Sequence, residues 1–159
     1  MKKIVTIMMF MLLFVMNELW ALNESQSLKI ENNASPIRTT ETILSEGFEG
    51  AFPSGSWTVI GSPTWDDQNY LARTGSWAAW CADTSLNPSG GAYSNNMNAQ
   101  MKYGPFSLSG ASSFSISYWI RGNTEPNYDF LFLAISGDDN NWYSMESISG
   151  NLGTSWTNK

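Results

Sequence analysis

The sequence contains no histidine, a single cysteine and few charged residues. Of its 159 residues, 8 are basic and 14 acidic, so 14% carry a charge, against roughly 25% in an average soluble domain. Without histidine, the chain cannot form a Ser-His-Asp or Cys-His nucleophile system, or a histidine-ligated metal site. Cys81 alone cannot form an internal disulfide or a four-cysteine zinc site, and it is either a small buried residue or a free thiol.

The charge balance is acidic, with a formal net charge of −6. Nucleic acids are bound through basic patches that contact phosphates, and this chain has no surplus of lysine and arginine to build one. We therefore expect no nucleic-acid partner. Eight tryptophans stand out against this background of few charges.

The N-terminus has the layout of a secretory signal peptide. Two lysines follow Met1, and the uncharged apolar run 4–16 comes next, interrupted only by Thr6. A run of about 13 residues is too short to cross a bilayer core of ~30 Å as a helix. We expect a signal-peptide helix over 1–21, with cleavage after Ala21 and no stable membrane span afterwards. An uncleaved N-terminal anchor is the alternative. The chain is therefore predicted to be secreted, or exposed at the cell surface.

Two further regions follow the predicted signal peptide. Residues 22–42 are polar without apolar periodicity, which is typical of a flexible leader. From residue 43 onward, short runs of β-branched and aromatic residues alternate with Gly, Pro, Asn and Ser clusters. This texture predicts one antiparallel all-β sandwich domain over 43–159, with candidate strands at 43–49, 56–60, 77–81, 99–103, 113–121, 129–136 and 142–148.

The C-terminal end suggests an incomplete domain. The chain stops just where a further strand begins near Trp156. We expect a fragment truncated at its C-terminus, and the alternative is a complete small protein with a frayed tail.

Several blocks of residues in this order resemble the MAM-like jelly roll of choice-of-anchor J proteins and of the cleaved-adhesin domains in gingipain-type proteases. This family belongs to exported bacterial proteins and has a concanavalin A-like sandwich. Ser107 replaces the family's usual Asp, and Gly55 and Ser56 widen its Pro-x-Gly-Trp turn. The matching blocks are 46–50 (EGFEG), 52–53 (FP), 57–58 (WT), 75–79 (GSWAA), 105–110 (PFSLSG), 128–129 (YD), 135–138 (ISGD) and 141–142 (NW).

The resemblance implies a structural calcium ion. Glu49 is the ligand candidate on the first strand, and Asp129 is a second candidate. Calcium takes six to eight oxygen ligands, which carboxylates, carbonyls and water supply. The acidic turn at 138–141 could contribute as well, although it does not match an EF-hand loop. The alternative is that these residues form turns or are solvated acids.

Tryptophans are the candidate ligand-binding residues. An exposed indole can stack on a sugar ring or anchor a protein interface, although most tryptophans pack in cores. Trp65 lies in a polar segment beside Asp66 and Asp67, and Trp119 falls on the wetter face of its predicted strand. We expect these two to contact a ligand.

These observations predict a non-catalytic binding or adhesion module of an exported bacterial protein. Its expected partner is an extracellular glycan or a host or matrix protein. The alternative is an accessory domain of a secreted peptidase or glycoside hydrolase whose catalytic part lies elsewhere. A structural spacer that binds nothing is the third possibility.

Overall fold

The chain folds as antiparallel β-structure. The computed structural model describes residues 4–13, 40–82, 89 and 93–159, and among these residues it contains strands but no helix. It follows that none of the described residues belongs to a helix long and apolar enough to cross a membrane. The strands are β1 (Ile4–Leu13), β2 (Trp57–Ile60), β3 (Asp66–Gln68), β4 (Ala78–Trp80), β5 (Ala99–Ser107), β6 (Trp119–Asn123), β7 (Asp129–Ser136), β8 (Trp142–Ser149) and β9 (Asn151–Asn158).

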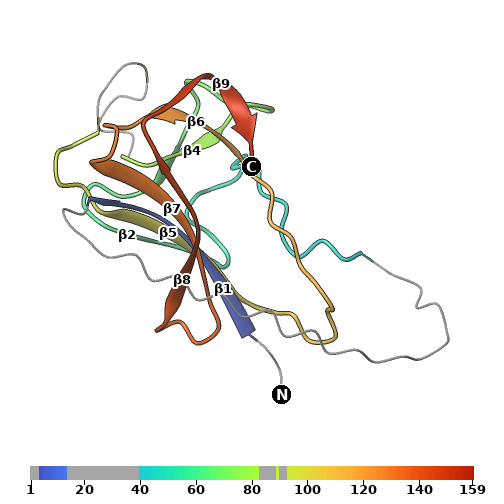
Figure 1. The fold of residues 1–159 in the computed structure, drawn as a ribbon. Helices are drawn as coiled ribbons and strands as arrows, with labels where there is room; N and C mark the ends of the chain where they lie inside the picture. Colours follow the sequence, from blue (N-terminus) through green and yellow to red (C-terminus); the bar gives the residue numbers. More distant parts are fainter. Residues whose placement is uncertain (1–3, 14–39, 83–88, 90–92) are drawn as a thin grey trace.

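Five of these strands form one large sheet in the order β2-β5-β1-β7-β8. Strand β1 lies in its centre and pairs antiparallel with both β5 and β7. Two smaller pairs, β3-β4 and β6-β9, complete the described strands. Figure 1 shows β4, β6 and β9 grouped together above the large sheet.

One apolar core joins the large sheet to the smaller strand pairs. Ala99, Met101, Leu131 and Ile148 come from the large sheet, and Ile120 comes from β6. Burial of such side chains from two layers is what stabilises a sandwich-like arrangement. The all-β, antiparallel fold class predicted from the sequence is therefore confirmed at this level. The other buried members of the cluster are Trp65, Ala82 and Met97.

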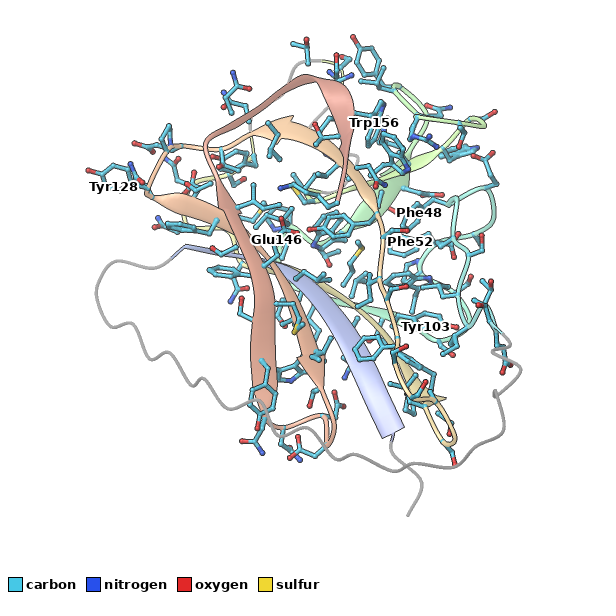
Figure 2. The ribbon with its side chains drawn as sticks, turned by 45° about the vertical axis from the view of Figure 1, so that its right-hand side comes forward. Phe48, Phe52, Tyr103, Tyr128, Glu146 and Trp156 are labelled. Atoms are coloured by element: carbon cyan, nitrogen blue, oxygen red, sulfur yellow. The ribbon has the colours of Figure 1, made fainter. Side chains whose placement is uncertain are left out.

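An aromatic cluster attaches the segment before β2 to the edge of the large sheet. Phe48 and Phe52 lie edge to face with centroids 5.2 Å apart, Phe52 meets Trp57 at 5.8 Å, and Trp57 meets Tyr103 at 5.1 Å. Such aromatic pairs stabilise the fold in addition to the free energy gained by burying their surface area. Figure 2 shows Phe48 and Phe52 side by side, with Tyr128 at the opposite edge of the molecule.

Several predicted strands agree closely with the structure, and two do not. Strand β7 has the predicted bounds 129–136, and β8 is one residue longer than predicted. No strand forms at 43–49, because Phe48 adopts a positive φ of 61° and its N–H bonds the Glu46 carboxylate at 2.7 Å. The strand predicted at 113–121 is confined to β6, because within the described residues 113–117 pair with no strand.

Strand β1 is the largest difference from the sequence prediction. Residues 4–13 form a strand where a signal-peptide helix is predicted. Their β-branched and apolar side chains suit a central strand, which is paired on both edges and carries few polar residues. The conformation does not test export, so the signal peptide stays a prediction. The cleavage position after Ala21 and most of the predicted leader 22–42 lie outside the described residues.

Candidate functional site

Trp65 is a core residue. Its side chain is only 6% exposed, and its indole N–H donates to the carbonyl of Ala99 at 3.1 Å. Both the apolar rings and the single polar atom are therefore used within the protein. The surface position predicted for Trp65 is wrong, since the tertiary contact with β5 turns the ring inward despite its polar neighbours Asp66 and Asp67.

Trp119 is exposed, as its place in the predicted strand suggested. It begins β6, and 44% of its surface is accessible. The guanidinium of Arg73 lies 3.6 Å from the ring centroid, which is a cation–π contact. Arg73 covers one ring face, so the remaining accessible surface of the indole is available to a ligand.

The structure has an open groove whose lining residues do not include Trp119. It has a volume of about 470 Å³ and begins at Tyr118, the residue before Trp119. Its walls come from the segment before β6, from β7 and β8, and from Lys159, which follows β9. The polar lining residues are Tyr118, Glu146 and Lys159, and the apolar ones are Phe114, Ile116, Leu133 and Met145.

The polar residues of the groove form one connected network. The Tyr118 hydroxyl donates to Glu146 Oε2 at 2.5 Å, and Lys159 Nζ lies 2.9 Å from Glu146 Oε1. The bond from Tyr118 and the bond and positive charge of Lys159 lower the pKa of Glu146 below its usual 4.5. Burial and the same carboxylate raise the pKa of Tyr118. The groove thus combines aromatic and aliphatic walls with a fixed carboxylate. Figure 2 shows the place of Glu146.

Replacing Glu146 with glutamine is expected to lower the free energy of unfolding by about 1 kcal/mol at pH 7, since only the charged part of the two bonds is lost. A carboxyl whose pKa is lowered on folding stabilises the protein above its unfolded pKa. The stabilisation is lost as the pH falls from about 4.5, the usual pKa of the carboxyl, through the lower pKa that Glu146 has in the folded protein. Urea unfolding of both proteins between pH 7 and pH 3 should therefore show a difference that shrinks with acidity.

The control for this measurement is Asp139→Asn. Asp139 forms an exposed ion pair with Lys102 at 2.9 Å, and its side chain is 53% exposed. Exposed pairs contribute about 0–1 kcal/mol to stability, so Asp139→Asn should change the free energy of unfolding by no more than that. A difference for Glu146→Gln that stays constant down to pH 3 would contradict the role given to its charge.

Glu49, the first predicted calcium ligand, bonds backbone amides. Its Oε1 accepts from Ser76 N at 2.9 Å and from Trp77 N at 3.0 Å. Gly75, with φ +68°, makes room for this contact, because a Cβ there would lie 2.2 Å from Glu49 Oε1. The backbone of the Gly-Ser-Trp block at 75–77 therefore binds the carboxylate of Glu49.

Asp129, the second predicted calcium ligand, begins β7 and is only 5% exposed. Its Oδ2 accepts a short hydrogen bond from the Tyr93 hydroxyl. Burial and this bond raise the pKa of Tyr93 to about 12. Within the described parts of the chain, no three acidic or cysteine side chains converge to hold a metal ion. The described residues thus do not assemble Glu49 and Asp129 into a calcium site, and calcium binding stays a prediction.

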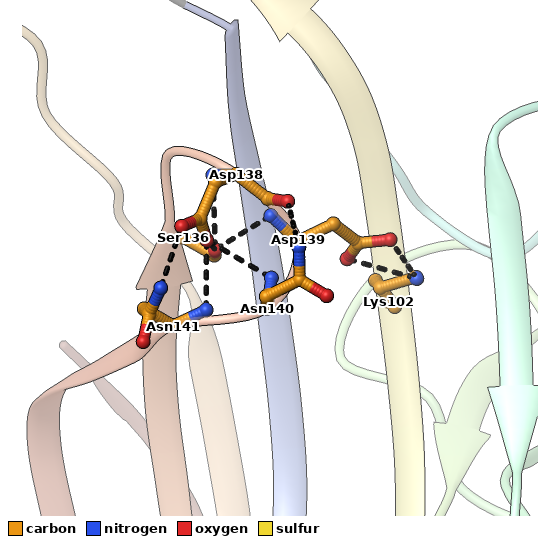
Figure 3. Close-up of polar contacts among 6 residues, drawn as sticks. All are labelled: Lys102, Ser136, Asp138, Asp139, Asn140 and Asn141. Carbon is orange, nitrogen blue, oxygen red and sulfur yellow. Dashed lines mark hydrogen bonds and ion pairs between the residues drawn. The ribbon is translucent and has the colours of Figure 1, made fainter.

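The acidic turn between β7 and β8 is held by its own side chains. Asp138 Oδ1 accepts from the amides of Asn140 at 2.9 Å and Asn141 at 2.7 Å, and the Ser136 hydroxyl donates to the same oxygen at 3.1 Å. These bonds hold the pKa of Asp138 far below its usual range. Figure 3 shows this network, together with the ion pair of Asp139 and Lys102. Asp138 therefore has the turn-forming role that the sequence predicted as the alternative to calcium ligation.

The sequence predictions missed part of the groove. Met145 and Glu146 lie on the predicted strand 142–148 and Lys159 follows β9, but nothing in their local sequence indicates that Tyr118 faces them. The alternation of Ile116 and Tyr118 with exposed serines was the available signal for one wall.

Comparison of the chain with protein-family models, with curated proteins and with solved structures found no match.

Proposed function

We propose that this chain is a non-catalytic binding module of an exported protein, with an extracellular glycan or protein as its ligand. The observation that carries the proposal is Trp119, a large aromatic residue that remains 44% exposed. A flat apolar ring with one N–H suits both sugar rings and protein side chains. Secretion and membership of the MAM-like family are parts of the same proposal, supported by the sequence blocks described above.

Two further features of the fold support a binding role. The open groove offers apolar walls and an ordered carboxylate within reach of Tyr118 and Lys159. Arg73 fixes the indole of Trp119 in one orientation, which lowers the entropy lost when a ligand binds.

Replacing Trp119 with alanine is expected to weaken ligand binding at least about tenfold, because a tryptophan at the centre of an interface contributes 2 kcal/mol or more. Binding would be measured first on glycan arrays and immobilised matrix proteins, and then by titration of the best ligand with both proteins.

Tyr128→Ala is the matched control. Tyr128 is 60% exposed, and it lies at the edge of the molecule away from the Phe48 cluster. Its removal should leave the Kd unchanged. An absence of binding to every glycan and protein tested, or equal weakening by both substitutions, would overturn the proposal.

A further inference from the structure

Strand β1 connects two halves of the large sheet that do not otherwise pair. It matches seven residues of β5, from Ile4 opposite Ser107 to Met11 opposite Ala99. It matches eight residues of β7, from Thr6 opposite Ser136 to Leu13 opposite Asp129. In the strand order, β2 and β5 lie on one side of β1, and β7 and β8 lie on the other.

The residues of β1 are also the apolar part of the predicted signal peptide. Cleavage after Ala21 would separate them from the domain. The facing edges of β5 and β7 would then each carry a row of unpaired N–H and C=O groups. Unpaired backbone groups are costly when buried, and open strand edges recruit other strands.

The flanking strands have other contacts that hold them on either side of this position. Met101 of β5 and Leu131 of β7 belong to the same buried cluster. Lys102 of β5 pairs with Asp139 in the β7–β8 turn at 2.9 Å. Figure 3 shows Asp139 reaching from the turn towards Lys102 on β5. The shared core cluster, with a small contribution from this exposed ion pair, therefore links the two sides through residues outside β1.

We propose that the position between β5 and β7 is a strand-binding site that, once residues 1–21 are cleaved, binds an extended apolar segment of another polypeptide by β-strand addition. The segment runs antiparallel to both edges, spans about eight residues and is uncharged, as Ile4–Leu13 is. Main-chain hydrogen bonds on both sides supply affinity, and the apolar neighbours in β7 exclude charged side chains. A second mature copy lacks residues 4–13 and cannot supply this segment, and the proposal takes a segment of a different polypeptide as the donor.

This inference rests on the export that the proposed function includes, because it requires cleavage after Ala21, but its site is distinct from Trp119 and from the groove. The test uses the full chain with a specific protease site placed within residues 24–30. The folded chain is cut there and incubated with an excess of a fluorescent peptide of sequence 4–13, which carries a tri-lysine tag outside the strand. Incorporation is followed by size-exclusion chromatography and fluorescence anisotropy.

We expect the cut chain to incorporate the labelled peptide at one copy per chain, and the uncut chain to exclude it. A control peptide with Ile7→Pro and Phe10→Pro should bind at least about tenfold more weakly, because each proline removes a ladder hydrogen bond. If loss of the cut segment unfolds the chain, addition of the unmodified peptide should restore its circular dichroism spectrum.

Four results would overturn the proposal. The first is a cut chain that releases residues 4–13, keeps its stability and binds no peptide. The second is equal binding of both peptides, which would indicate non-specific hydrophobic adsorption. The third is an unfolded cut chain that the peptide does not refold. Dimers of the cut chain formed without peptide would show that copies pair with each other, which contradicts a foreign donor.

Discussion

Trp65→Ala is expected to lower the free energy of unfolding by about 3–5 kcal/mol, the range for deleting a large buried aromatic side chain. Trp65 is 6% exposed within the core cluster, and its indole N–H bonds the carbonyl of Ala99 at the start of β5. The substitution removes the ring from the core and leaves that carbonyl without its donor. Urea unfolding followed by far-ultraviolet circular dichroism would measure the loss.

Trp119→Ala is the matched substitution. It removes the same side chain from an exposed position, together with the cation–π contact of Arg73, which contributes about 0.5–1 kcal/mol. The two variants should therefore differ by 2 kcal/mol or more in stability, while Trp119→Ala affects ligand binding. Similar losses in both variants would contradict the placement of Trp65 in the core.

The contrast between these two tryptophans shows what local sequence can predict. Trp119 stands in an alternating run, and period-two alternation correctly indicated its exposed face. Trp65 precedes two aspartates, and its polar neighbours suggested a surface loop. Its burial depends on Ala99, which lies 34 residues away. No local pattern reports such a contact.

Strands were predicted best where composition and turn chemistry agreed. The apolar run of β7 ends in Gly137, Asp138 and their neighbours, and the side-chain bonds of Asp138 close that turn as Asx residues commonly do. The missed strands lack this agreement. Strand β3 is three residues long, and its two aspartates have low strand propensity. In β1, a single apolar run fits both the predicted export signal and the observed central strand.

The candidate site shows the same difference between what local sequence predicts and what contacts between distant segments determine. The sequence correctly predicted that Trp119 is exposed, and it predicted Glu49 and Asp129 as calcium ligands. It did not show that these two carboxylates bond different groups, amides in one case and a tyrosine hydroxyl in the other. Hydrogen-bond partners of this kind are set by the packing of distant segments, which sequence spacing alone does not determine.

Gly61→Ala is expected to destabilise the protein by about 3–5 kcal/mol, through backbone strain and steric overlap together. Gly61 directly follows β2 and has φ +126°, a conformation that is essentially restricted to glycine. A Cβ at this position would lie 2.4 Å from the carbonyl oxygen of Asn98 and 3.0 Å from the Cα of Ala99. Both are backbone atoms at the start of β5, which pairs with β1 and β2 and cannot move without disturbing the sheet.

Gly55→Ala separates the two contributions. Gly55 also has a positive φ, +61°, but nothing lies within 4 Å of the position its Cβ would occupy. That variant carries strain without overlap and should lose about 1–2 kcal/mol. Thermal and urea unfolding of both proteins would give the difference. Equal losses would mean that the segment after β2 does not pack against the start of β5, and would remove the contact that also holds Trp65 on Ala99.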